Sequence, residues 1–184
     1  MPGFDRFTEE AQDAVTRAYE VMMRHEHSQL DIEHIVVALL EQGSEQVQAA
    51  LEDLHVDVEA IRQRVEDVLH SSTLGPVARS AHPQQVYITP RVKRMMERSN
   101  EEAVRLQDEF ISTEHLMLAV LSEGDSAAVQ ILNEEGVTYK SFGEALGRTR
   151  KGEPRADTTQ TTWKTLEKYS RDLTQAAREG RLDP

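Results

Sequence analysis

Two pairs of neighbouring residues in this chain combine an acid with an imidazole, Glu33-His34 and Glu114-His115. Such a pair can transfer protons or hold a metal ion. Neither pair belongs to an HExxH motif, in which two histidines one helical turn apart face the same ion. His25 and His27 are two positions apart, so they would not share a helix face. We therefore predict no catalytic residues and no metal ligands, and we interpret the two paired histidines as structural residues near helix starts.

The two pairs are copies of each other, because the same offset of 81 residues recurs along the chain. Thr8 aligns with Thr89 (89 − 8 = 81) and Val56 with Val137 (137 − 56 = 81), and no gap is needed between these points. An offset held over this length indicates an internal duplication. Duplicated helical units favour a binding surface over a single catalytic cleft. The duplication also predicts that a residue with a role in the first repeat has a counterpart with the same role 81 positions later.

Composition restricts the class of protein. The chain has 184 residues, a net charge of −12, 38% hydrophobic and 5% aromatic residues, and no cysteine. The acidic charge argues against nucleic acid or an anionic membrane as a partner, since both need basic surfaces. The lack of cysteine excludes disulfides and thiolate zinc sites and fits a cytoplasmic protein. The first residues do not resemble a signal peptide, and the longest apolar run, Ile35 to Leu40, is too short to span a bilayer.

Helical periodicity predicts an all-α fold made of two four-helix units related by a pseudo-two-fold axis. Thr8 and Thr89 are good N-caps for the first helices, and Pro90 suits the first helical position. Glycine is common just past a helix end, so Gly43 and Gly124 are predicted to end the second helices. Cap-forming residues predict where the other helices begin: Asp31 and Ser112 for the second, Ser44 and Asp125 for the third, Asp57 and Thr138 for the fourth.

The pattern divides the chain into five segments. Residues 1–70 form the first repeat and residues 87–148 the second, joined by a linker at 71–86 that contains Gly75-Pro76 and His82-Pro83. Residues 149–162 are basic and then threonine-rich, which is typical of a flexible tether. A helical pattern returns over residues 163–184 without a partner to cover its apolar face. We interpret this last segment as the truncated start of another domain.

Several of these residues resemble a known family. Phe7-Thr8-Glu9-Glu10-Ala11 and Thr89-Pro90-Arg91-Val92-Lys93 resemble the two repeat openings of the Clp amino-terminal domain. Ile32-Glu33-His34-Ile35 and Ser112-Thr113-Glu114-His115-Leu116 resemble its recurrent (S/T)-E-H-(L/I) signature, from which Ile32 departs. Leu166 to Leu173, followed by Gly180-Arg181-Leu182-Asp183-Pro184, resembles the entry to the first ATPase domain of ClpB and ClpC unfoldases. The resemblance covers nearly the whole chain and is similar to both subfamilies.

The resemblance implies a domain that receives substrates and adaptors for an ATP-dependent protein unfoldase, which either feeds a ClpP-type protease or acts in disaggregation. It also implies that Thr8 with Glu33, and Thr89 with Glu114, form candidate pockets for phosphorylated arginine or a peptide. A hydrophobic groove for unfolded clients or adaptors would be lined by Phe4, Phe7, Val86 and Tyr87. The same resemblance implies a hexamer for the full-length protein, whereas we expect the fragment to be monomeric.

Two other functions stay open on the sequence. The chain could be a free-standing helical adaptor that shares the repeat, or a hydrolase that uses the Glu-His pairs. Residues 143–149 are a poor imitation of a phosphate loop, because the spacing is wrong and no Gly-Lys pair is present. We therefore expect no enzyme activity and no cofactor in this fragment, with ATP and Mg²⁺ bound only by domains beyond it.

Overall fold

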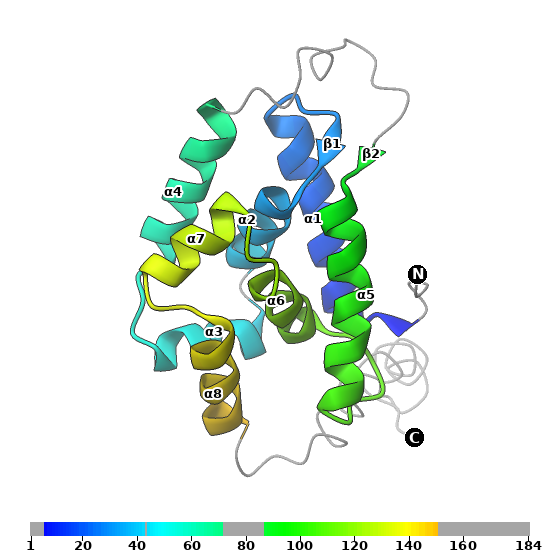
Figure 1. The fold of residues 1–184 in the computed structure, drawn as a ribbon, viewed down its shortest axis with the longest axis vertical. Helices are drawn as coiled ribbons and strands as arrows, with labels where there is room; N and C mark the ends of the chain where they lie inside the picture. Colours follow the sequence, from blue (N-terminus) through cyan, green and yellow to red (C-terminus); the bar gives the residue numbers. More distant parts are fainter. Residues whose placement is uncertain (1–5, 43, 72–86, 151–184) are drawn as a thin grey trace, which may run out of the picture.

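A computed structural model describes residues 6–42, 44–71 and 87–150 of the chain. Within these residues the fold is all-α, apart from two very short strands (Figure 1). The elements, in chain order, are α1 (Glu9–Arg24), β1 (Gln29–Leu30), α2 (Ile32–Gln42), α3 (Glu45–Asp53), α4 (Val58–Ser71), β2 (Tyr87–Ile88), α5 (Pro90–Arg105), α6 (Thr113–Leu121), α7 (Ala127–Glu134) and α8 (Tyr139–Thr149).

The first helix of each repeat begins where the sequence predicts. The Thr8 side chain accepts a hydrogen bond from the Ala11 backbone N–H at 3.1 Å, and Thr89 accepts one from Val92 at 3.3 Å. Both bonds satisfy amides that the first turn of a helix leaves without a partner. The apolar stripes behind these caps are buried: Ala11, Ala14, Val15, Ala18 and Met22 in α1, and Val92, Met95, Met96, Ser99 and Ala103 in α5.

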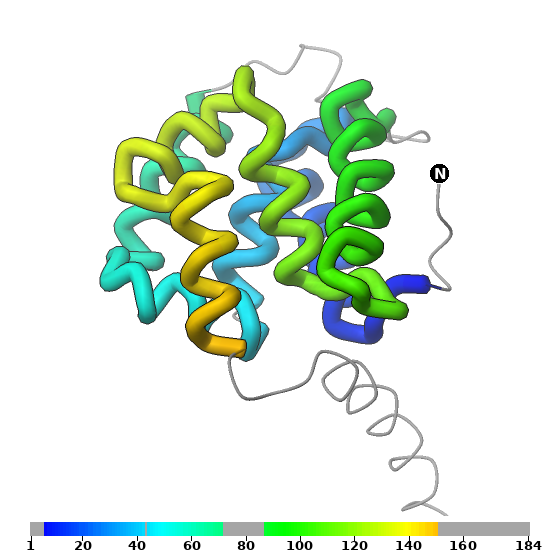
Figure 2. Tube along the Cα trace, turned by 60° about the horizontal axis from the view of Figure 1, so that its bottom comes forward, coloured from blue at the N-terminus to red at the C-terminus, as the bar shows by residue number. Residues whose placement is uncertain are grey.

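Helices α2 and α6 form the centre of the molecule (Figures 1 and 2). Every residue from Ile32 to Leu40 and from Thr113 to Leu121 is buried. A helix that is apolar all round must be covered on all sides. The cover comes from both repeats, because α2 contacts α1, α4 and α7, while α6 contacts α5, α8 and α3.

The two repeats are interwoven rather than set side by side. Helix α3 of the first repeat packs against α8 of the second, and α7 of the second packs against α4 of the first. In Figure 2 these helices lie together at one side of the molecule. The third helix of each repeat therefore buries its apolar face on the fourth helix of the other repeat. The two four-helix units predicted from the sequence exist in chain order but share a single core.

Short parallel pairings cross between the repeats in the same way. Strand β1 pairs with β2 so that Leu30 lies opposite Ile88, and an isolated bridge joins Phe7 to Ile111. These are copies of one contact, since 88 − 7 and 111 − 30 are both 81. In each, the residue that precedes the first helix of one repeat pairs with the segment that precedes the second helix of the other. The pairing thus brings the start of α5 to the start of α2, and the start of α1 to the start of α6.

The structure corrects two predicted helix ends. Helix α6 ends at Leu121, with Ser122 as its C-cap, so Gly124 lies beyond the end and does not take the left-handed backbone that favours glycine there. The N-cap of α7 is Ser126 rather than Asp125, because the Ser126 hydroxyl reaches the Ala128 N–H. Gly43, Phe4, Val86 and residues 151–184 lie outside the described residues.

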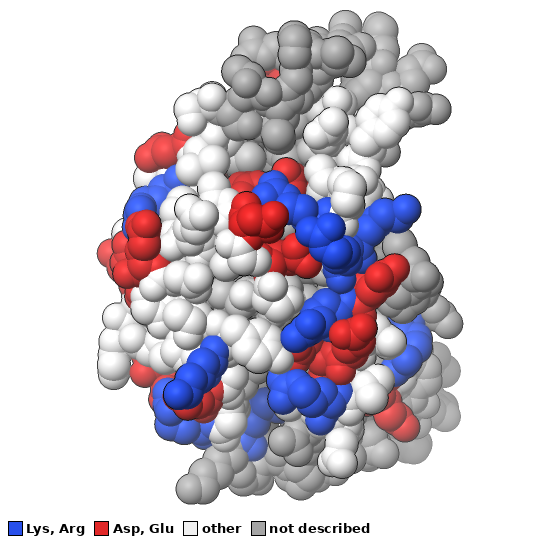
Figure 3. Space-filling model, in the orientation of Figure 1, with Lys and Arg blue, Asp and Glu red and all other residues white. Residues whose placement is uncertain are grey.

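Charged side chains of both signs lie close together on the face drawn in Figure 3. Along α5, for example, Arg94 pairs with Glu123 at 3.0 Å, and Arg98 and Arg105 both pair with the buried carboxylate of Glu102. The acids Glu102 and Glu123 are therefore paired with arginines of α5. In the described part of the chain, no helix has the length and apolar character needed to cross a membrane.

Candidate functional site

The four predicted pocket residues meet at the starts of α2 and α6, but their pairing is crossed. The Thr89 hydroxyl donates to Asp31, the residue before α2, at 3.1 Å. The Thr8 hydroxyl contacts that of Ser112, the residue before α6, at 3.3 Å. Each glutamate thus lies with the threonine of the other repeat, which corrects the prediction that Thr8 joins Glu33. The physical reason is the strand pairing, which exchanges the segments that precede the helices.

The first site, here the Glu33 cluster, consists of Asp31, Glu33, Thr89, Arg91 and Ser126. Glu33 is buried, and its Oε2 accepts hydrogen bonds from the Ser126 hydroxyl at 2.8 Å and from the Ala128 N–H at 3.2 Å. It therefore caps α7, where the positive end of the helix dipole favours a carboxylate. Its Oε1 lies 3.5 Å from an Arg91 guanidinium nitrogen. Both oxygens of Glu33 are thus engaged by the protein itself.

Arg91 contacts both acids of this cluster, Asp31 and Glu33. Its guanidinium donates to both oxygens of Asp31, at 3.1 and 2.6 Å, in the two-pronged geometry that arginine makes with a carboxylate. Burial by itself would raise the pKa of Asp31, but the hydrogen bonds from Arg91 and Ile32 outweigh it and hold that pKa below its ordinary value. The Asp31 side chain is therefore ionised at neutral pH and paired to the chain's own arginine.

The second site, here the Glu114 cluster, consists of Thr8, Glu10, Ser44, Glu114 and Arg150. Glu114 is only 2% exposed, and its Oε1 has no hydrogen-bond partner among the described residues. Its Oε2 lies 3.8 Å from an Arg150 nitrogen, too far for a hydrogen bond. The Ser44 hydroxyl, at the start of α3, is bonded instead to Thr113 at 2.5 Å. Among the described residues, the acid at this site is buried and only partly satisfied.

Three substitutions at matched positions explain why the clusters differ. The copy of Arg91 is Glu10, the copy of Ser126 is Glu45, and the copy of Asp31 is Ser112. At these matched positions the first cluster has an arginine and a hydroxyl, whereas the second has two further acids, and the arginine of the second cluster, Arg150, comes from the end of α8. Burial raises the pKa of Glu10, and the charges of Glu114 and Glu45 raise it further. Acidic side chains therefore gather at the Glu114 cluster, where Arg150 lies 3.8 Å from Glu114.

The histidines of the two pairs position the helix starts, as predicted. The Nδ1 atom of His34 accepts from the Asp31 N–H at 2.9 Å, and that of His115 accepts from the Ser112 N–H at 2.8 Å. The proton of each ring is therefore on Nε2. His115 donates it to Asp108 at 2.7 Å, and His34 donates it to His27 at 3.0 Å.

The structure describes two of the four residues predicted to line a hydrophobic groove, Phe7 and Tyr87. Phe7 is 4% exposed, forms a bridge with Ile111 and belongs to the core. Tyr87 is 58% exposed, and Phe4 and Val86 lie outside the described residues. On the first helices of the two repeats, Met23 of α1 is exposed, whereas Met22 of α1 and Met95 and Met96 of α5 are buried.

The sequence reading did not identify four residues that decide the character of the two sites: Glu10, Arg91, Ser126 and Arg150. The offset of 81 would have shown that Glu10 is the copy of Arg91, so that the charge is reversed between the two repeats at this position. Nothing in the sequence places Arg150 within 4 Å of Glu114, since that contact depends on how α8 packs.

Comparisons with known proteins agree with this geometry. Residues 6–135 match the model of the Clp repeat (R) N-terminal domain. The chain is 31% identical to "Chaperone protein ClpB" of Oceanobacillus iheyensis and 32% identical to "Negative regulator of genetic competence ClpC/MecB" of Bacillus subtilis. In each case the alignment covers 98% of this chain and 22% of the relative. The chain spans about a fifth of the length of these relatives.

Solved structures show the same fold. The N-terminal domain of Hsp104 from Candida albicans matches with a TM-score of 0.67 and 16% identity, over 82% of this chain and 95% of that one. The N-terminal domain of ClpD from Arabidopsis thaliana matches with a TM-score of 0.61 and 16% identity, over 81% of this chain and all of that one. The chain therefore belongs to the Clp repeat N-terminal domain family, as the N-terminal domain of a ClpB/ClpC-type chaperone.

Proposed function

We propose that this domain receives client proteins or adaptors for a Clp-type ATPase, and that the Glu114 cluster binds a guanidinium group of the client. The observation that carries this proposal is the buried Oε1 atom of Glu114, which has no hydrogen-bond partner in the described part of the chain. Leaving a buried carboxyl oxygen without a hydrogen-bond partner costs free energy, and a guanidinium that binds there would recover it.

The Glu33 cluster supports the proposal because it contains an internal example of a guanidinium beside carboxylates. There, Arg91 places a guanidinium against Asp31 and 3.5 Å from Glu33. At the matched position of the second cluster stands Glu10, so α1 supplies no arginine to Glu114. Phosphoarginine suits the site further, since backbone N–H groups and hydroxyls at helix starts can take its phosphate. We therefore assign the ligand to the Glu114 cluster alone.

Calorimetry with free phosphoarginine and the 184-residue chain tests the proposal. We expect binding with a Kd below about 1 mM. The variant Glu10→Arg introduces a guanidinium at the position that Arg91 has in the other cluster. This side chain should pair with Glu114 and so compete with the guanidinium of the ligand. Binding should then weaken at least tenfold, which corresponds to about 1.4 kcal/mol.

Glu9→Arg is the matched control, because it makes the same change of charge one position away on an exposed side chain. It should bind like the unchanged chain. Equal weakening in both variants would show that the ligand responds only to net charge, and absence of binding to the unchanged chain would refute the proposal. Unphosphorylated arginine in the same titration shows whether the phosphate contributes.

We further propose that this chain does not hydrolyse ATP itself and binds no cofactor for that purpose, and that the complete protein is a cytoplasmic hexamer whose motor lies beyond residue 184. A tethered receiving domain raises the concentration of a weakly bound client near the motor. A phosphate-loop motif encoded within a few tens of residues after Pro184 would support this, whereas a stop codon there would favour the free-standing adaptor.

A further inference from the structure

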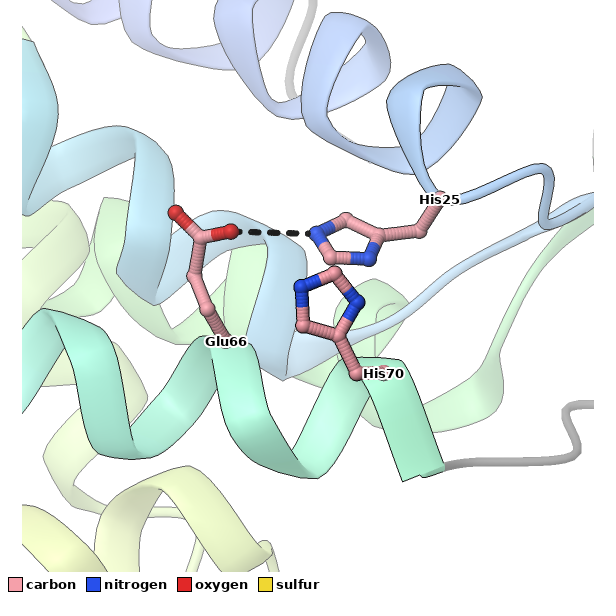
Figure 4. Close-up of side chains that lie close together, drawn as sticks. All are labelled: His25, Glu66 and His70. Carbon is pink, nitrogen blue, oxygen red and sulfur yellow. Dashed lines mark hydrogen bonds and ion pairs between the residues drawn. The ribbon is translucent and has the colours of Figure 1, made fainter.

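Three side chains with metal-binding atoms converge where α1 and α4 end (Figure 4). His25 is the C-cap of α1, and Glu66 and His70 lie one turn apart on α4, so both face the same side of that helix. One ligand atom from each residue lies within 4.8 Å of the others. Figure 4 shows the two imidazole rings beside each other, with the Glu66 carboxylate directed at His25.

The distances suit a small tetrahedral ion. The Nε2 atom of His25 lies 3.3 Å from Oε1 of Glu66, which is long for a charge-assisted hydrogen bond. Metal–ligand distances of about 2.0–2.1 Å in a tetrahedron put ligand atoms about 3.3 Å apart. The His25–Glu66 pair is therefore already spaced as two ligands of one ion, and only His70 has to approach.

The surroundings orient the carboxylate and favour a cation. Arg24 and Arg62 both donate to Oε2 of Glu66, which leaves Oε1 directed at His25. Partners of this kind, which hold a ligand in place, are typical of metal sites. The ends of α1 and α4 both contribute the partial negative charge of a helix C-terminus. The positive charges of the two arginines oppose the ion, while Glu41 pairs with both of them and offsets that effect.

The site combines a buried ligand with a route from solvent. The side chain of His25 is 4% exposed, whereas His70 is exposed and forms the open side.

We propose that His25, Glu66 and His70 bind a divalent transition-metal ion of the Zn²⁺ class and thereby join the ends of α1 and α4. Two imidazoles and a carboxylate suit Zn²⁺ rather than Mg²⁺ or Ca²⁺, which prefer oxygen ligands alone. A second group of three, Asp108, Glu114 and His115, is less suited, because both Arg150 and His115 already form hydrogen bonds with the Asp108 carboxylate.

The test is a titration of the metal-free 184-residue chain with ZnCl₂, followed by calorimetry and by the ring-nitrogen NMR signals of the histidines. We expect one ion per chain, with the signals of His25 and His70 shifting together. The ion binds the folded state, so the thermal unfolding midpoint should rise. His70→Ala removes an exposed ligand without disturbing the core and should weaken binding at least about tenfold.

His55→Asn is the control, because His55 is an exposed histidine on a left-handed turn that asparagine also accepts. It should bind Zn²⁺ like the unchanged chain. Glu66→Gln provides a second variant and should also weaken binding. The proposal is overturned if the chain binds no Zn²⁺, if MgCl₂ binds equally well, or if His70→Ala leaves the affinity unchanged.

Discussion

At the scale of single residues, the two copies of one histidine motif have acquired different partners. His34 and His115 both accept a backbone N–H through Nδ1, which fixes the same tautomer in each ring. The acceptor that each Nε2 proton reaches differs, since the Asp108 carboxylate of the second repeat is replaced by the His27 imidazole in the first. One pair can therefore hold an ionised acid, whereas the other consists of two imidazoles that cannot both be charged at close range.

This difference predicts how stability depends on pH. Burial lowers the pKa of His34 from 6.5 to about 3, and the neighbouring His27 adds to the effect. Below pH 6.5 the unfolded chain binds a proton at this residue and the folded chain does not, so the free energy of unfolding falls as the pH falls. Between pH 7 and pH 5 the loss from His34 should be about 2 kcal/mol.

The measurement is urea unfolding of the unchanged chain and of His34→Gln at both pH values. The variant should be less stable at pH 7 but should lose less stability on going to pH 5. Carboxylates with a lowered pKa, such as Asp31 and Asp108, lose their contribution to the free energy of unfolding only below about pH 5. They therefore do not affect the comparison between the two pH values. An equal loss in both chains would contradict the assignment.

At the scale of elements, the helix starts were predictable and the helix partners were not. Thr8, Thr89 and Thr138 act as N-caps because a side-chain oxygen three residues before an amide can satisfy it locally. The partner of α3 could not be found in this way. Its buried residues show that one face is covered, but they fit α4 and α8 equally well, and only the tertiary structure shows that the cover is α8.

The exchange of helix partners predicts where the second repeat is most sensitive. Phe142 is fully buried on α8, the helix that packs against α3. Phe142→Ala should lower the free energy of unfolding by about 3–5 kcal/mol, because the large cavity is fixed between two repeats and cannot collapse easily. Val104→Ala, at a side chain 61% exposed on α5, should change it by no more than about 0.5 kcal/mol. Denaturant unfolding checks both, and similar effects would contradict the packing described.

At the scale of the whole molecule, the duplication produced one folding unit with two different sites. Strand pairing, the α3–α8 contact and the α4–α7 contact all cross between the repeats. The second site differs from the first because acids stand where the first has Arg91 and Ser126. A single core holds both sites in fixed positions. The loss of symmetry lets Glu33 cap α7, whereas Oε1 of Glu114 has no hydrogen-bond partner among the described residues.

An interwoven fold predicts that the repeats do not fold separately. Residues 1–71 and residues 87–150, made as two peptides, should each show little helix and no cooperative unfolding, because each exposes the apolar faces that the other covers. Mixed together, they should regain the helical circular dichroism signal and a cooperative transition. A cooperative transition in either peptide alone would refute this.

The sequence by itself determined the duplication, the helix starts, the buried stripes and the family, because each of these depends on short-range spacing or on a fixed offset. It also identified Glu33 and Glu114 as residues of interest. Only the tertiary structure decided which threonine lies near which glutamate and that Arg91 pairs with Asp31. It also decided that His25 lies beside Glu66 and His70. These contacts join residues that are far apart in the chain, and their formation depends on how helices pack, which local periodicity does not specify.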